Sequence, residues 1–461
     1  MTGIAASAPR TRSARHPRVV LLAMCVGMFL IQLDVTIVNV ALPTIGHQFG
    51  AGVAGLQWVV DGYAVVLSAL LLGGGAIADR LGHKPVVIAG LAAFGLGSVA
   101  CALAPGIATL VAARALQGLA AATMLPGTLA IITRTFAEPA ARAKAIGLWA
   151  GVAGVSLPLG PLLGGALLAG PGWRAIFWLN VPIVAAAIAA VAYSVAGDRP
   201  GASGSFDAAG LLLGAAALGA AVFGFIEAGR AGWTSPIVWG SWVVAAALAV
   251  GLWRVEKRHP APMLPPGVFA NRRFRIGAVV TAAMTIVGMG TIFVTTLLLQ
   301  GIGHYTPLRA GIAVLPCLIP MALLPPLTGR LVARYGPHRP AIVGYLLGAV
   351  GMLSMIAVSR QPTYVMLLLP LACTGIALAL ITPAMVALVM GAAPPGRAGI
   401  ASGVSNTARQ TGGAIGVALF GALVGDAANP AAFVRGLAVV GGVGAVIYLA
   451  AVAGLVRDSR R

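Results

Sequence analysis

Fourteen long apolar runs follow one another along this chain of 461 residues, separated by short polar segments. A helix rises 1.5 Å per residue, so about 20 apolar residues cross the hydrocarbon core of a bilayer, which is about 30 Å thick. The runs therefore predict an all-α integral membrane protein with fourteen transmembrane helices. The expected spans are 19–42, 55–78, 85–104, 107–133, 143–169, 174–196, 206–227, 236–253, 274–301, 308–332, 340–358, 362–391, 399–425 and 432–456.

The composition agrees with a membrane protein, because 59% of the residues are hydrophobic and only 9% are charged. Lys and Arg outnumber Asp and Glu by 30 to 10, but they lie in short loops between apolar runs. A nucleic-acid-binding protein carries such charge as a patch on a soluble domain, so no nucleic-acid partner is expected. The four cysteines lie in separate apolar runs and the six histidines in tails or loops, so no metal site is expected either.

The distribution of positive charge predicts the topology. If both termini and every second loop are cytoplasmic, these segments together with the span ends that adjoin them hold 23 of the 30 Lys and Arg residues, whereas the outer loops with their adjoining span ends hold 5. The remaining two, Arg114 and Arg409, lie well inside spans. Because cytoplasmic loops are enriched in Lys and Arg, the count predicts an even number of spans. We expect a multi-pass protein of the cytoplasmic (inner) membrane with both termini in the cytoplasm.

An internal repeat predicts two homologous halves. The stretches "GAIADRLGHKPVVIAG" (75–90) and "GRLVARYGPHRPAIVG" (329–344) share glycines and an Arg-x-Gly at the same offsets. Parallel six-helix repeats are a transporter architecture, with the binding site between the halves near the midplane. The predicted domains are a cytoplasmic tail (1–18), an N-terminal six-helix bundle (19–196), an inserted helix pair (197–253), a cytoplasmic linker (254–273), a C-terminal six-helix bundle (274–456) and a second cytoplasmic tail (457–461).

Six stretches in the same order resemble the major facilitator superfamily, in its 14-helix drug:proton antiporter branch. They are "LDVTIVNVALP" (33–43), "GAIADRLGHK" (75–84), "LVAARALQGLAAA" (110–122), "GVAGVSLPLGPLLGG" (151–165), "GWRAIFWLNVPI" (172–183) and "GIASGVSNTARQTGGAIGVALFG" (399–421). They cover nearly the whole chain. The resemblance implies export of drugs or antibiotics in exchange for protons.

Two of these motifs carry expected roles. The second stretch (75–84), which we call the loop motif, is expected by resemblance to tie its loop to the other half when the cytoplasmic side is closed. The alternative is a loop that only sets the topology and holds a local salt bridge. Its residues are Gly75, Asp79, Arg80 and Gly82. The fourth stretch (151–165), which we call the helix-5 motif, marks exporters in the family. The alternative is that its small residues serve close helix packing alone. Its residues are Gly151, Gly160, Pro161, Gly164 and Gly165.

Few acids are present, and only Asp34 and Asp61 lie well inside spans. At 1.5 Å per residue, Asp34 lies about 12 Å, Asp61 about 9 Å and Arg114 about 10 Å below the outer surface. In the family's fold the three helices that carry them are close neighbours. Two acids beside one cation are not both stable as anions in a low dielectric, so one should hold and exchange a proton. We expect Asp34, Asp61 and Arg114 to form a proton relay; the alternative is a static Asp–Arg pair that orients helices.

Polar residues on other helix faces are candidates for the substrate cavity. Gln32, Thr36 and Asn39 share one helical stripe, and Asp34 points roughly the opposite way, so Asp34 is expected to face Arg114 and not the substrate. The partner of Arg409 stays open among backbone carbonyls, a cavity water, an acid across the interface and an anionic substrate. The candidate cavity residues are Gln32, Thr36, Asn39, Gln117, Asn406, Arg409 and Gln410.

These features predict a proton-coupled antiporter that exports amphipathic, often cationic drugs, dyes or antibiotics by alternating access. The sequence lacks the G-x-x-x-x-G-K-[ST] phosphate loop, so the proton gradient and not ATP is the expected energy source, with no cofactor. The expected partners are the small-molecule substrate, protons and membrane lipids, and the chain is expected to be monomeric. A dedicated exporter of one natural product or metabolite, including an anionic one, is the first alternative. A membrane enzyme or a non-transporting receptor is the second, and the missing nucleophile–base constellation argues against it.

Overall fold

The computed structural model describes residues 16–136, 138–195, 207–260, 262, 267, 269–392, 398–425 and 429–460. Within these residues all regular secondary structure is helical, which confirms the predicted all-α class. Most of the predicted N-terminal tail, part of the predicted linker and Arg461 lie outside the described residues.

Each of the fourteen expected spans overlaps helical structure, and two of them are built from several elements. The ninth span consists of α9 and the π-helix η1, and the tenth of α10, α11 and α12. The elements are α1 (Pro17–Phe49), α2 (Val53–Leu81), α3 (His83–Ala102), α4 (Ile107–Thr135), α5 (Pro139–Ala169), α6 (Arg174–Ser194), α7 (Ala208–Ala231), α8 (Pro236–Arg258), α9 (Arg272–Leu297), η1 (Leu298–Ile302), α10 (Pro307–Ala313), α11 (Leu315–Leu323), α12 (Pro325–Tyr335), α13 (His338–Arg360), α14 (Tyr364–Gly391), α15 (Ala398–Val424) and α16 (Pro430–Ser459).

The structure supports eleven to thirteen membrane helices among the described residues. Eleven helices are long and apolar enough on their own, and thirteen result if two bent pairs each count as one span. One of these pairs is α11 and α12, which meet at 53° where Pro325 begins the second helix. A proline there removes a backbone donor and ends the preceding helix. The predicted count of fourteen is therefore not confirmed, and α15, with its polar residues near Arg409, is not among the candidates.

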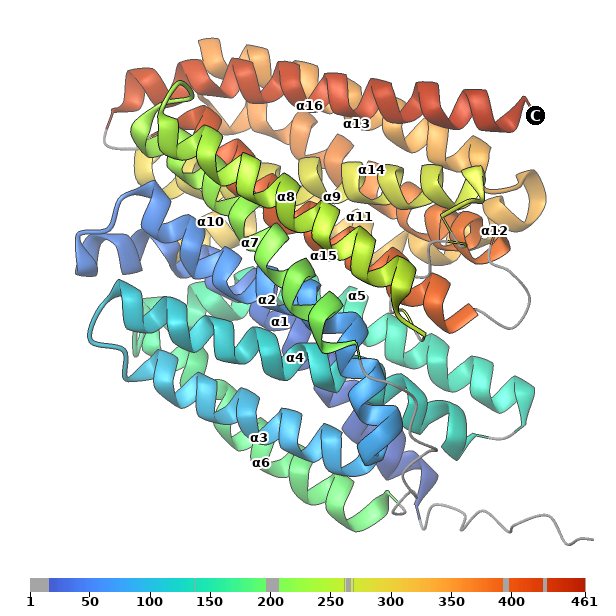
Figure 1. Ribbon diagram of the computed structural model, residues 1–461. Helices are drawn as coiled ribbons and strands as arrows, with labels where there is room; N and C mark the ends of the chain where they lie inside the picture. Colours follow the sequence, from blue (N-terminus) through green and yellow to red (C-terminus); the bar gives the residue numbers. More distant parts are fainter. Residues whose placement is uncertain are drawn as a thin grey trace, which may run out of the picture.

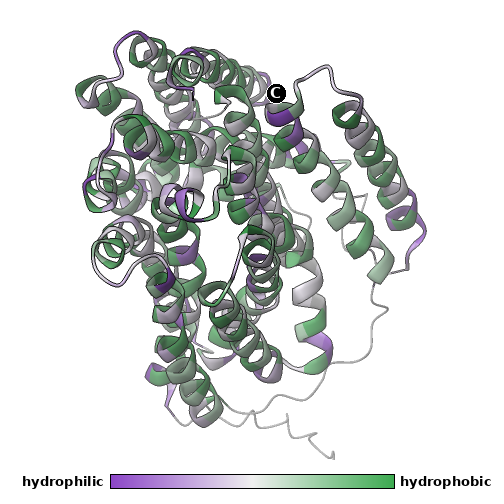
Figure 2. Cartoon of the chain, turned by 90° about the vertical axis from the view of Figure 1, so that its left-hand side faces the viewer, coloured by the Kyte–Doolittle hydropathy of each residue, from purple (hydrophilic) through white to green (hydrophobic). Residues whose placement is uncertain are grey.

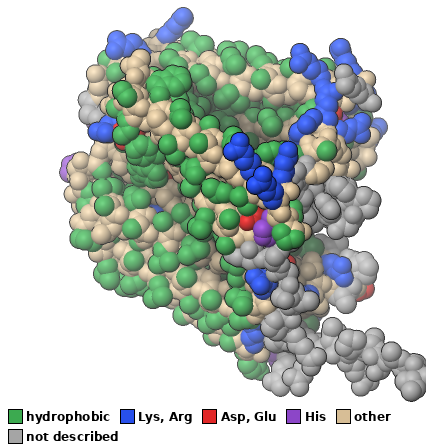
Figure 3. Space-filling view, viewed as in Figure 1, with side chains coloured by type: hydrophobic (Ala, Val, Ile, Leu, Met, Phe, Trp, Pro, Cys, Tyr) green, Lys and Arg blue, Asp and Glu red, His purple; other side chains and the backbone are tan. Residues whose placement is uncertain are grey.

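The helices lie side by side, so that their ends form two faces of the molecule (Figure 1). α1 begins and α16 ends at the face on the right of Figure 1, which we call the terminus face. The opposite face, called the far face, carries the connections 50–52, 103–106 and 170–173. Figure 2 views the far face and shows hydrophobic residues along most of each helix. Hydrophobic side chains cover much of the side seen in Figure 3, with Lys and Arg gathered mainly toward the terminus face.

Two groups of helices pack mainly within themselves. In the first, α2 and α3 pack on α4, α3 packs on α6, and α1 packs on α5. In the second, α9 packs on α15, α13 on α14 and α16, and α11 on α14. α7 and α8 pack on each other, and α7 also contacts α2 and α15. The pair thus covers the seam where the two groups meet.

Glycines allow the closest approaches between helices. Gly118 on α4 faces α2, where a Cβ atom would lie 3.2 Å from the Cα atom of Tyr63. Gly416 on α15 faces α9, where a Cβ atom would lie 2.7 Å from the Cα atom of Ile286. Small residues at such crossings let helices in a membrane pack by close van der Waals contact. The first crossing holds α4 against α2 one turn from Arg114.

The two groups are joined in the half of the molecule nearer the far face. Gln57, in the first turns of α2, donates through Nε2 to the carbonyl oxygens of Val417 (3.2 Å) and Ala418 (2.8 Å) on α15. Gln300 donates through Nε2 to the carbonyl oxygen of Val40 at 2.9 Å. The last part of α5 packs on α10 and α11.

Candidate functional site

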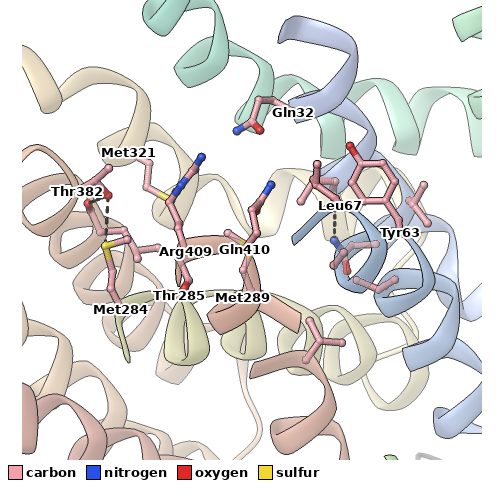
Figure 4. A pocket seen from close by; sticks show the side chains of 18 of the residues that line it. Gln32, Tyr63, Leu67, Met284, Thr285, Met289, Met321, Thr382, Arg409 and Gln410 are labelled. Atoms are coloured by element: carbon pink, nitrogen blue, oxygen red, sulfur yellow. Dashed lines mark hydrogen bonds between the residues drawn. The ribbon is translucent and has the colours of Figure 1, made fainter. Parts of the chain in front are cut away.

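A cavity of about 950 Å³, counting the part that opens to solvent, lies between the two groups of helices. Helices α1, α2 and α4 line one side of it, and α9, α11, α14 and α15 line the other. Figure 4 shows the polar ends of Gln32, Arg409 and Gln410 pointing toward the same space. The lining residues are Gln32, Val35, Val38, Asn39, Val60, Tyr63, Ala64, Leu67, Arg114, Met284, Thr285, Met289, Met321, Leu378, Thr382, Arg409, Gln410, Gly413 and Val417.

A buried ion pair stands in the cavity wall. The Oδ2 atom of Asp34 on α1 accepts from Nη1 of Arg114 on α4, and each residue is only 1% exposed. Arg114 also donates from Nη1 to Gln117 Oε1 (2.8 Å) and from Nε to the carbonyl oxygen of Val59 (3.1 Å). Its guanidinium carbon lies 4.5 Å from the ring centroid of Tyr63. A buried pair is stable only when further hydrogen bonds satisfy it, and these partners supply them to Arg114, whereas Asp34 Oδ1 has no hydrogen-bond partner among the described residues.

Two of the three residues of the helical stripe predicted for α1 line the cavity. Gln32, Val35 and Asn39 line the cavity, while Asp34 turns toward α4. Thr36 lies instead toward α5: its hydroxyl donates to the carbonyl oxygen of Leu33 at 3.2 Å, and it lines a smaller pocket together with Asn39. The α1 helix therefore separates the acid from the cavity-facing amides, as its periodicity requires.

Asp61 does not join the ion pair. It is 0% exposed, and neither of its carboxylate oxygens has a hydrogen-bond partner among the described residues. It lies on α2 four residues from both Gln57 and Val65, which contact α15. The structure thus brings together Asp34 and Arg114 but places the third predicted member of the relay at another interface.

Arg409 supplies the second cationic group of the cavity. Its Nη2 atom donates to Asn406 Oδ1 at 2.5 Å on the same helix. Gln410 lines the cavity beside it, whereas Asn406 does not line it. The hydrogen-bond partner that the sequence left open is therefore Asn406, and no acid among the described residues forms an ion pair with Arg409. Gln117 is also outside the cavity lining, because its amide bridges Arg114 and Ser98 (2.8 Å).

The loop motif lies at the terminus face. The side chain of Asp79 is 74% exposed and lies 3.5 Å from Nε2 of His83, four residues further along. Arg80 is exposed, and Gly82 has a φ of +93°, which favours glycine at the turn between α2 and α3. Gly75 lies against Pro126 of α4. In this conformation Asp79 makes the local contact, and the tie to the other half remains a prediction.

The helix-5 motif joins α5 to both groups of helices. A Cβ atom at Gly160 would lie 2.9 Å from the backbone nitrogen of Ile37, and one at Gly165 would lie 2.9 Å from the backbone nitrogen of Leu308. Gly164 also faces Ile37, and Pro161 faces Gly311 of α10. Gly151 has open space around it. Four of the five predicted residues are therefore packing positions, which supports small-residue packing without testing the link to export.

Several cavity and interface residues were not assigned from the sequence. Three methionines line the cavity: Met284 and Met289 on α9, and Met321 on α11. In the sequence each of them lies in an apolar run, where nothing distinguishes it from its hydrophobic neighbours. Their proximity arises only because α9 and α11 both pack on α14. The interface role of Gln57 has a weak indication in the sequence, because its polar amide lies one turn from Asp61 in an otherwise apolar stretch.

A helical membrane protein with a mainly apolar cavity that holds a few polar side chains between two helix groups has the architecture of a secondary transporter. The sequence profile of the Major Facilitator Superfamily matches residues 24–417. The chain therefore belongs to the major facilitator superfamily.

Curated relatives and solved structures agree with this assignment. The chain is 36% identical over 406 residues to "Multidrug resistance protein Stp" of Mycobacterium tuberculosis (strain ATCC 25618 / H37Rv), covering 88% of the chain and 75% of that relative. It is 32% identical over 420 residues to "Tetracenomycin C resistance and export protein" of Streptomyces glaucescens, covering 91% and 78%. It is 32% identical over 406 residues to "Methylenomycin A resistance protein" of Bacillus subtilis (strain 168), covering 88% and 87%. The crystal structure of the peptide transporter POT in complex with sulfate superposes with a TM-score of 0.70 at 16% identity, over 98% of this chain and 97% of that chain, which shows a shared fold.

Proposed function

We propose that this protein is a proton-coupled antiporter that exports amphipathic organic molecules such as drugs, dyes or antibiotics across the cytoplasmic membrane. Membership of a transporter family supports transport, and relatives named for multidrug resistance, antibiotic resistance and export support the direction and substrate class. The same membership supports the expectation that the chain is not an enzyme.

The proposed topology has fourteen spans with both termini in the cytoplasm, so that the terminus face is cytoplasmic. The enrichment of Lys and Arg in the segments of this face supports the orientation. The bundles 19–196 and 274–456 rock about the central cavity, and the pair within 197–253 covers their seam. The contacts of Gln57 and Gln300 near the far face correspond to a state closed to the outside. The transporter works as a monomer.

The ion pair in the cavity wall carries the proposal. While Asp34 is ionised, it neutralises Arg114, and the pair contributes no net charge to the cavity. A proton on Asp34 leaves the Arg114 charge unbalanced in a low-dielectric wall, where it repels a cationic substrate strongly. Proton and substrate binding then compete, which is the requirement for antiport. Each proton moved inward across 100 mV releases about 2.3 kcal/mol to drive export.

Drug-stimulated proton movement in proteoliposomes tests the proposal. Asp34→Asn keeps the shape of the side chain but fixes it in the neutral state that leaves Arg114 unbalanced, so the variant should bind a cationic substrate weakly and should not exchange it for protons. Glu227→Gln is the matched control, because Glu227 pairs with Arg230 near the far-face end of α7, away from the cavity. Normal proton exchange by Asp34→Asn would refute the role of this residue.

Arg409 favours a second candidate, an exporter dedicated to one acidic natural product. Among the described lining residues, Arg114 is neutralised by Asp34, whereas Arg409 has only an amide partner, so the cavity carries a net positive charge. Clefts of one sign concentrate ligands of the opposite sign. Binding of an anionic and a cationic dye, measured against pH, separates the two candidates. Protonation of Asp34 should weaken binding of the cation but strengthen binding of the anion.

A further inference from the structure

Helix α8 turns most of its surface away from the rest of the molecule. The structure describes all 23 of its residues, and only Val238 and Glu256 among them are buried. Its main packing partner is α7. The helix is also long and apolar enough to cross a membrane, so its outward side lies against lipid.

A stripe of apolar side chains on α8 leads to two arginines. Val243, Ala247 and Val250 are exposed, and their spacing of four and three residues places them on one side of the helix. Spacings of four residues continue this stripe to Arg254 and Arg258 in the last turns, and both are exposed. Lys and Arg side chains gather over this end of α8 on the front of the molecule in Figure 3. The stripe thus ends in positive charge.

The buried acid of α8 fixes the direction of this stripe. Glu256 is 2% exposed, and a Cβ atom at Gly210 of α7 would lie 2.9 Å from its Oε1 atom, so Glu256 faces α7. Two residues turn the direction of a side chain by about 200° around a helix, so Arg254 and Arg258 point away from α7. Asp207, the other acid at this end of the pair, is also buried and accepts from the backbone nitrogen of Gly210 at 2.7 Å. Neither arginine has an acidic partner among the described residues.

A groove beside the two arginines has the charge to hold a phosphate group. Its volume is about 510 Å³, counting the part that opens to solvent. Lys257 adds a third cation at this end, with its Nζ atom 5.0 Å from the ring centroid of Trp253, which is 45% exposed. Tryptophan in such a place anchors a helix at the boundary between lipid and water, and guanidinium groups bind phosphate oxygens in pairs. The residues that line the groove are Arg254, Val255, Arg258, His259 and Pro260.

We propose that the stripe and the groove bind one anionic phospholipid, whose phosphate contacts Arg254 and Arg258 and whose acyl chains lie along Val243, Ala247 and Val250. A phospholipid presents the same order of groups, with apolar chains below a phosphate. A soluble anion contacts the arginines but leaves the stripe uncovered. A zwitterionic lipid brings an ammonium group that the cations repel. Anionic lipids give the cytoplasmic leaflet its negative surface, which matches the proposed orientation of the terminus face.

The bound lipid ties the inserted helix pair to the membrane surface. α8 packs on α7, and α7 contacts α2 and α15 at the seam of the two helix groups. A ligand that binds only the folded protein stabilises it increasingly as its concentration rises. Anionic lipid therefore stabilises the pair in its place over the seam. This inference rests on the proposed topology for the choice of leaflet, and it does not depend on proton exchange at Asp34.

Native mass spectrometry of the full-length protein, released from detergent, tests the site by counting bound lipids. The protein is titrated with phosphatidylglycerol or with phosphatidylcholine that has the same acyl chains. The first phosphatidylglycerol should bind about tenfold or more tightly than the first phosphatidylcholine, because only the former meets the arginines without an ammonium group. Glycerol phosphate, which has the headgroup charge but no chains, should not displace the lipid at equal concentration.

Two double variants decide whether these arginines form the site. Arg254→Gln/Arg258→Gln should weaken the first phosphatidylglycerol about tenfold or more. Arg309→Gln/Arg435→Gln is the matched control, because it removes the same charge from two exposed arginines near the far face and should bind like the unsubstituted protein. Thermal unfolding is a second readout: phosphatidylglycerol should raise the melting temperature of the control but not of the Arg254→Gln/Arg258→Gln protein.

Three results would overturn the lipid site. They are equal binding of the two lipids, equal weakening by the two double variants, and displacement of the lipid by glycerol phosphate at equal concentration, which would assign the arginines to a soluble anion. Asp34→Asn should bind phosphatidylglycerol like the unsubstituted protein, so a failure of the proposed antiport leaves this outcome unchanged.

Discussion

Replacement of Arg114 by glutamine should destabilise the protein strongly, and in a pH-dependent way. The substitution removes the ion pair with Asp34, the bonds to Gln117 and to the Val59 carbonyl, and the stacking on Tyr63. Removing one partner of a buried pair costs about 3–5 kcal/mol, because the other charge is left without compensation. At low pH the lone carboxyl of Asp34 keeps its proton and is tolerated, so the loss should grow as pH rises.

Thermal unfolding of detergent-purified protein between pH 5 and pH 8 measures this effect. The double variant Asp34→Asn/Arg114→Gln should recover most of the loss, since it leaves no buried charge. Arg309→Gln is the matched control, because this exposed arginine stacks on Tyr305 at the far face and should change stability little. A stabilising role of the Asp34–Arg114 pair would be contradicted if Arg114→Gln unfolds like the unsubstituted protein at pH 8. It would also be contradicted if the double variant is no more stable than the single one.

Two further changes test the motifs. Asp79→Ala should slow substrate flux severalfold without changing substrate affinity, because the exposed carboxylate is proposed to act only when the terminus face closes. Unchanged flux would contradict the tie between the loop motif and the other half. Gly160→Val should reduce thermal stability and substrate flux, because the valine side chain would collide with the backbone of Ile37 on α1. Gly151→Ala is the control: position 151 has open space, so this variant should match the unsubstituted protein in melting temperature and flux.

The regular succession of apolar runs and short polar segments along the chain made much of the fold predictable. Apolar runs of membrane length predicted the helices, and helical periodicity on α1 predicted that Asp34 points away from Gln32 and Asn39. The number of spans was harder, because Pro325 breaks one of them and the polar residues around Arg409 lower the hydropathy of α15.

The site was predictable only where one helix decides the direction of a side chain. Depth placed Asp34, Asp61 and Arg114 in one layer, but depth does not give the angle at which each side chain leaves its helix. Asp61 shares a stripe with Gln57 and Val65 that faces α15, and this became evident only from packing. The three methionines of α9 and α11 likewise line one cavity only because both helices pack on α14.

Proton release on substrate binding tests the central claim most directly. A substrate identified by resistance profiling of a pump-deleted host is added to the purified protein in weakly buffered detergent, and the change in pH is recorded. If Asp34 exchanges its proton for substrate, the unsubstituted protein should release up to about one proton per molecule bound at a pH where Asp34 is protonated, and Asp34→Asn none. Proton uptake, no exchange at any pH, or equal release by Asp34→Asn would contradict it.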